Sequence, residues 1–118
     1  MRLHKNLVYT VIDSIRDIFN DGVYADKAVE KALKRDRRWG SRDRKFVAET
    51  IYDIVRWKRL YAEIANVKEP FDRPNIWRLF SVWCVLKGIP LPEWNQIEPT
   101  PTRRIKGRFD TLIKIRKF

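Results

Sequence analysis

The chain has 118 residues, of which 44% are hydrophobic and 13% aromatic, so it can bury one core and does not have the composition of a disordered chain. Its formal net charge of +11 indicates a polyanionic partner. Because there is one cysteine, Cys84, and one histidine, His4, an internal disulfide and a zinc site made of these ligands are excluded.

Two helices are predicted at the start of the chain. Apolar residues recur at three- and four-residue spacing over residues 3–19, which is typical of one face of an amphipathic helix. Asp21 is followed by Gly22, which can take positive φ and so ends this helix. A shorter second helix is predicted from Ala25 to about Lys34.

The third predicted helix begins after Gly40. Ser41 is its expected N-cap, and Asp43 lies in the first turn, where the helix dipole favours an anion. The apolar stripe of this helix runs through residues 46–65, so the helix either continues unbroken or bends near Trp57.

The fourth predicted helix follows a connector of residues 67–74 and has a proline in its first turn. Asp72 or Arg73 is expected at its cap. Residues 76–86 are apolar almost all round, as in a central buried helix, and Gly88 ends this segment.

The proline-rich stretch of residues 89–102 predicts a loop, with one turn at Pro92 to Asn95. A last amphipathic helix is predicted from about Thr102, although Gly107 weakens it. Its expected apolar stripe is Ile105, Phe109, Leu112 and Ile113. The chain is therefore expected to be a single all-α domain, a bundle of five or six helices over residues 1–118.

No enzyme site is recognisable in the sequence. The glycines are isolated, which excludes a glycine-rich phosphate loop, and there is no G-x-S-x-G motif. Cys84 lies in the most apolar segment and is interpreted as a packed core thiol. We expect no catalytic residue, cofactor or metal in this chain. The most apolar run, residues 79–86, is too short to span a bilayer, and we expect a cytoplasmic protein without a membrane partner.

The excess positive charge is concentrated in two segments. Residues 27–45 hold nine Lys/Arg against three acids, and residues 103–117 hold seven against one, so each segment carries a net +6. The rest of the chain sums to −1. This distribution favours a directed binding surface over a generally basic coat.

The sequence KRDRRWGSRDRKF, residues 34–46, contains the densest cluster. A solvated helix corner would explain Gly40 and Ser41, but it would not explain so many like charges in one place. Phosphate binding would explain them, because arginine offers a planar donor fork and helix N-terminal amides attract anions. Trp39 is expected to close the apolar edge of the corner, with stacking on a base as the alternative. The predicted phosphate-contacting residues are Lys34, Arg35, Arg37, Arg38, Arg42, Arg44, Lys45, Arg103 and Arg104.

Two motifs in this region carry a family resemblance. G-S-R-D-R-x-F-x-A-E spans residues 40–49, and Y-D-I-V-R-W follows at residues 52–57. With them, residues 24–61 resemble the N-terminal NusB-like domain of the Sun/Fmu family of ribosomal RNA cytosine-5 methyltransferases, of the Bacteroidetes type. The first helix and the closing RFDTLIKIRKF are similar too, so the resemblance spans most of the chain and is weakest in the proline-rich loop.

The resemblance implies a NusB-like fold that positions structured ribosomal RNA for a separate catalytic domain, which binds S-adenosylmethionine. The motifs of that domain are missing here, and Cys84 does not match its catalytic cysteines. The chain is therefore expected to be the N-terminal fragment of a longer methyltransferase, with ribosomal RNA and the C-terminal methyltransferase domain as partners. Two alternatives remain: a protein-docking module for the catalytic domain, and a stand-alone antitermination factor of the NusB kind.

Overall fold

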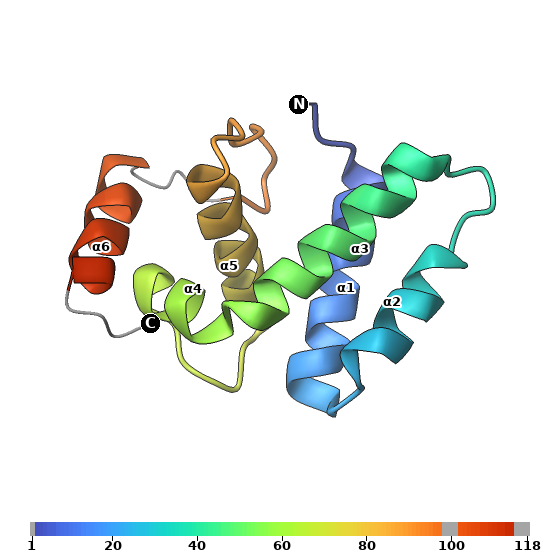
Figure 1. Cartoon of the computed structure of the whole chain (residues 1–118), viewed down its shortest axis with the longest axis horizontal. Coiled ribbons are helices and arrows are strands. Elements are labelled where there is room, and N and C mark those ends of the chain that lie inside the picture. Colours follow the sequence, from blue (N-terminus) through green and yellow to red (C-terminus); the bar gives the residue numbers. More distant parts are fainter. Residues whose placement is uncertain (1, 98–101, 115–118) are drawn as a thin grey trace. The chain divides into compact units, whose positions relative to one another are not determined.

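The computed structural model describes residues 2–97 and 102–114, without the side chains of residues 102 and 103. Within these ranges it contains six helices and no strand, which confirms an all-α bundle of five or six helices (Figure 1). The helices are α1 (Lys5–Asp21), α2 (Ala25–Leu33), α3 (Ser41–Arg56), α4 (Lys58–Ala65), α5 (Arg73–Leu86) and α6 (Thr102–Lys114). Contacts divide the chain into two units, one of Arg2–Arg56 and one that begins at Trp57.

The first unit is a three-helix arrangement in which α1, α2 and α3 each pack against the other two. The apolar stripes of α1 and α3 that the sequence predicts supply its core. Each side chain of this kind contributes about 1.5–3 kcal/mol when fully buried. Its most deeply buried side chains are Val8, Val11, Ile12, Ile15, Val47, Ile51 and Ile54.

The helix ends of the first unit follow from local chemistry, with one correction. α1 ends at Gly22, which has φ 71° in the left-handed region, as expected. The carbonyl of Gly40 accepts the first helical hydrogen bond of α3, from the amide of Arg44 at 3.1 Å. Gly40 is therefore the N-cap, and the prediction that Ser41 caps α3 is wrong by one residue. Glycine is itself tolerated at an N-cap, so sequence preference alone could not separate the two positions.

The third predicted helix is not continuous. Of the two alternatives, an unbroken helix and a bend near Trp57, the structure has a break at Trp57. α3 ends at Arg56, and α4 begins at Lys58, because Trp57 takes a non-helical conformation with φ −105° and ψ 25°. α4 ends at Asn66 in the left-handed conformation, with the amide of Val67 bonded to the carbonyl of Ala62 at 3.0 Å. Asparagine thus takes the role that glycine has at most such helix ends.

α5 is the most buried helix of the second unit. The side chain of Asp72 accepts a hydrogen bond from the amide of Asn75 at 2.8 Å, so of the two expected residues, Asp72 and Arg73, Asp72 is the N-cap. After Gly88, the amide of Ile89 reaches the carbonyl of Cys84 at 2.9 Å and closes the helix. α4 and α6 both pack on α5 and on each other, so α5 is central to this unit as its sequence predicts.

The last part of the chain agrees with the predictions in outline. Residues 89–97 form no helix, as predicted. Their turn lies at Asn95 and Gln96, whereas the prediction placed it at Pro92 to Asn95. The rest of the proline-rich loop, residues 98–101, falls outside the described residues. Ile105 and Leu112 of α6 are buried as predicted, whereas Ile113 is 43% exposed and does not belong to the core. Within the described residues, no helix is both long and apolar enough to cross a membrane.

Candidate nucleic-acid interface

The basic corner, residues 34–45, is the segment that joins α2 to α3 together with the first turns of α3. The amide of Trp39 donates to the carbonyl of Asp36 at 3.3 Å, and the Asp36 side chain accepts from the amide of Arg38 at 2.9 Å. Asp36 therefore opens a tight turn that its own carboxylate stabilises, as aspartate commonly does. The turn places Arg37 and Arg38 at its two central positions, where both side chains are exposed.

Trp39 lies on the inner side of this corner. Only 9% of the residue is exposed, and its indole nitrogen is buried without a hydrogen-bond acceptor among the described residues. This confirms that Trp39 closes the apolar edge of the corner. A ring in this position has no open face on which a base could stack.

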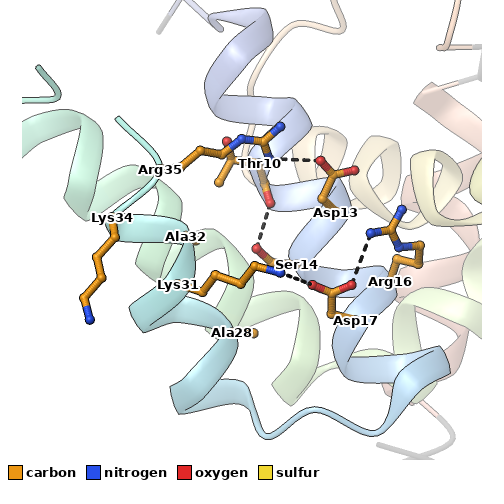
Figure 2. A pocket seen from close by; sticks show the side chains of 10 residues that line it. All are labelled: Thr10, Asp13, Ser14, Arg16, Asp17, Ala28, Lys31, Ala32, Lys34 and Arg35. Carbon is orange, nitrogen blue, oxygen red and sulfur yellow. Dashed lines mark hydrogen bonds and ion pairs between the residues drawn. The ribbon is translucent and has the colours of Figure 1, made fainter. Parts of the chain in front are cut away.

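Two arginines of the corner form ion pairs with nearby carboxylates. Arg38 binds Asp36 through two donor atoms, Nε at 3.0 Å and Nη2 at 2.9 Å. This bond lowers the pKa of the Asp36 carboxyl below its usual value and raises the pKa of Arg38. Arg35 pairs with Asp13 of α1 at 2.9 Å (Figure 2). Both arginines therefore have part of their charge neutralised by the chain itself.

Three further cations of the corner also have partners within the chain. Nη1 of Arg44 donates to the carbonyl of Leu33, the last residue of α2, at 2.9 Å. Lys34 pairs with Glu30 at 3.1 Å, and Lys45 pairs with Glu49 at 3.9 Å. The lysine pairs are exposed on both sides, so they stabilise the fold little and can exchange for another anion.

Arg37 and Arg42 differ from the other five cations of the basic corner, which all have partners within the chain. Both are exposed, and neither side chain forms an ion pair or hydrogen bond with any part of the chain that the structure describes. Arg42 lies in the first turn of α3, where helix amides point outward, although Asp43 in the same turn opposes an incoming anion. Among the predicted corner residues, these two have guanidinium groups with all their donors available.

The second predicted group belongs to the other unit. Arg104 is exposed on α6, as are its neighbours Gly107 and Thr111; for Arg103 the structure describes only the helical backbone. The structure does not relate α6 to the basic corner, so the expectation that they form one surface stays a prediction. α6 instead has a shallow depression of its own, about 450 Å³, lined by Arg104, Gly107, Arg108, Thr111 and Leu112.

A cleft between α1 and α2 is a feature that sequence reasoning missed. It measures about 500 Å³, and Ala28 and Ala32 of α2 line it with small side chains (Figure 2). Two ion pairs cross it: Lys31 of α2 with Asp17 of α1 at 3.8 Å, and Arg35, just after α2, with Asp13 of α1. The i, i+4 spacing of the two aspartates on α1 was the available signal. Since both carboxylates have partners, we interpret the two ion pairs as contacts that hold α2 and the residue after its C-cap against α1.

Cys84 is fully buried in α5, which confirms it as a core thiol. Burial raises its pKa to about 12. A thiol held neutral in this way is a poor nucleophile. Within the described residues, no group of His, Cys, Asp or Glu is arranged to hold a metal ion.

Comparison with known proteins returns no match: no family model, no curated protein and no solved structure is similar enough to this chain to identify its family.

Proposed function

We propose that this chain is an RNA-binding accessory domain of a ribosomal RNA cytosine-5 methyltransferase, and that it holds structured RNA by its phosphates at the basic corner. The observation that carries the proposal is the pair Arg37 and Arg42, which are exposed and without a partner among the described residues. Two free guanidinium groups on one short segment favour an external anion over a role in the fold.

The remaining corner cations support the same function in a weaker way. Lys34, Arg38 and Lys45 pair with acids on the surface, and Arg38 keeps 89% of its side chain exposed. Such pairs are worth little and are screened by salt, so a phosphate can replace the carboxylate. Arg35 and Arg44 instead tie helices together and are expected to contribute less to binding.

The identity of the polyanion comes from the resemblance of residues 24–61 to the Sun/Fmu N-terminal domain. Charge alone does not distinguish RNA from DNA. Phosphate contacts position a nucleic acid without reading its bases, so the proposal includes weak sequence preference. S-adenosylmethionine belongs in this proposal to a separate catalytic domain, which is also the second proposed partner.

The experiment is a binding titration of the chain with a labelled small-subunit ribosomal RNA fragment between about 50 and 200 mM salt. The test variant is Arg37→Gln/Arg42→Gln. We expect a rise in Kd at low salt and a salt slope reduced by about 1.4–1.8, since each lost phosphate contact removes about 0.7–0.9. Helicity should not change, because neither side chain forms a hydrogen bond or ion pair with the described chain.

The matched control is Lys27→Gln/Lys68→Gln, which removes the same charge from two exposed lysines that do not belong to the basic corner. Lys27 lies in the first turn of α2, at the other end of that helix. Equal losses in both double variants would contradict a directed surface. No RNA binding at about 50 mM salt would contradict the proposal altogether, and the docking of a catalytic domain on the corner would then be the hypothesis to test.

A further inference from the structure

Gly107 occupies the middle of α6, where glycine weakens a helix relative to alanine. Nothing in the described chain requires a glycine there. Its φ is not positive, unlike that of Gly22 and Gly88. A Cβ built on Gly107 would meet no heavy atom within 4 Å, so no neighbouring element needs the space either. The described residues therefore give no structural reason for the absence of a side chain at Gly107.

The side chains around Gly107 include two cations. Arg104 and Thr111 lie three residues before and four residues after Gly107, so they share its face of α6, and Arg108 lies four residues after Arg104, at the side of that face. These residues line the shallow depression of about 450 Å³, which we call the α6 notch, with Leu112 at its edge. The notch is bordered by cations and by one hydroxyl, and no acid is among its lining residues.

The two arginines of the notch are differently held. Nη2 of Arg108 donates to the carbonyl of Glu63, near the end of α4, at 2.7 Å, which fixes its guanidinium beside the notch. Arg104 is exposed and has no partner among the described residues. The Arg108 guanidinium is thus held in place and keeps further N–H donors for a ligand, whereas the Arg104 guanidinium can turn toward one.

We infer that the α6 notch is a second contact for the sugar-phosphate backbone of RNA, in which Arg104 and Arg108 bind phosphate and the bare face of Gly107 lets the strand lie against the helix. The inference rests on the proposed function for the identity of the polyanion. Charge complementarity favours a phosphodiester: the notch offers two guanidinium groups at neighbouring turns, and no acid among its lining residues opposes an anion.

Gly107→Ala provides a test in which stability and binding change in opposite directions. The added methyl group favours the helix and meets no clash among the described residues, so the thermal midpoint should rise. The same methyl group blocks close approach to the helix backbone, so the Kd for a labelled RNA hairpin should rise severalfold. An unchanged Kd in a variant whose thermal midpoint is raised would overturn the inference.

A charge variant supplies an independent measurement. Arg104→Gln should reduce the salt slope of RNA binding by about 0.7–0.9, the effect of one phosphate contact. Lys106→Gln is the matched control, because Lys106 is equally exposed on α6 but lies about 160° around the helix from Arg104. Equal slopes in the two variants would overturn the inference by showing a non-directed charge effect.

The outcomes separate this inference from the proposed function. If Arg37→Gln/Arg42→Gln weakens binding and the α6 variants do not, the corner binds RNA and the notch does not. If the α6 variants alone weaken binding, the notch is supported and the corner proposal fails. If Arg104→Gln instead weakens association with an acidic protein partner and leaves the RNA affinity unchanged, the notch is a protein contact and the inference is wrong.

Discussion

The carboxylate of Asp36 holds the Arg38 guanidinium through two hydrogen bonds, of 3.0 Å and 2.9 Å, and also accepts the Arg38 amide at 2.9 Å. One acid therefore both shapes the turn of the basic corner and neutralises part of its charge. The pKa of Asp36 is lowered by this contact, so the carboxylate stays ionised throughout the neutral range.

Asp36→Asn is expected to tighten RNA binding a few-fold at low salt. The amide oxygen of asparagine can still accept the Arg38 backbone amide and keep the turn, while the negative charge beside Arg38 disappears. The salt slope should become steeper by about 0.7–0.9 as Arg38 gains a phosphate contact. Kd values of Asp36→Asn and of the native sequence, measured across the salt series, test both the affinity and the slope. Weaker binding in Asp36→Asn would instead mean that the ion pair orients Arg38 for its ligand.

Arg44→Met is expected to destabilise the first unit by about 1 kcal/mol. The variant loses a charged donor at 2.9 Å from the carbonyl of Leu33, at the C-terminal end of α2, where a cation also interacts favourably with the helix dipole. Arg42→Met is the control. Its side chain is exposed and forms no hydrogen bond or ion pair within the described chain, so the change should stay within about 0.5 kcal/mol. Urea unfolding monitored by circular dichroism measures both, and equal effects would refute the capping role of Arg44.

Asp72→Ala is expected to lower the free energy of unfolding by about 1 kcal/mol, because the side chain accepts the Asn75 amide at 2.8 Å as the N-cap of α5. Asp72→Asn should restore most of this loss. Ser41→Ala should change stability far less, since Gly40 holds the N-cap position of α3. A loss of about 1 kcal/mol in Ser41→Ala would show that Ser41 caps α3 after all.

Cys84 is expected to resist alkylation in the folded protein. Burial raises its pKa from 9.0 to about 12, so at pH 8 the folded chain exposes neither the sulfur nor a thiolate. Mass spectrometry after iodoacetamide treatment should show modification only when denaturant is present. Modification of the folded protein as fast as that of the unfolded chain would contradict the burial of Cys84.

The same thiol predicts a pH dependence of stability. Between pH 9.0 and about 12 the unfolded chain loses the thiol proton while the folded chain keeps it, so the stabilising effect is complete below 9.0 and declines as the pH rises. The free energy of unfolding should therefore fall more steeply above pH 9.0 in the native sequence than in Cys84→Ala. Parallel curves for the two proteins would contradict the raised pKa.

Helix identity was largely readable from the sequence because it depends on local spacing. The apolar stripe of residues 3–19, the left-handed end at Gly22 and the Asp72 cap are short-range features, and the structure confirms each of them. The errors are also local. The N-cap of α3 and the turn after α5 are displaced by one or two residues, because neighbouring positions such as Gly40 and Ser41 have similar preferences.

The candidate site was less predictable, because the seven cations among residues 34–45 look alike in a sequence. Two of them have partners that are distant in the sequence: Asp13 is 22 residues from Arg35, and the carbonyl of Leu33 is 11 residues from Arg44. Only folding brings these groups within hydrogen-bond distance. The tertiary structure thereby leaves Arg37 and Arg42 as the two corner arginines without a partner among the described residues.

By itself, the sequence determined the all-α class, most of the helices, the buried role of Cys84, and the concentration of charge in two segments, and it favoured a buried Trp39. Each of these depends on residue type and on spacing along a few helical turns. The tertiary structure alone decided which cations tie helices together, that the helix breaks at Trp57, and that Gly107 faces an open notch between arginines. These depend on groups distant in sequence and on the packing that brings them together, since a pairing energy exists only once folding sets the distance.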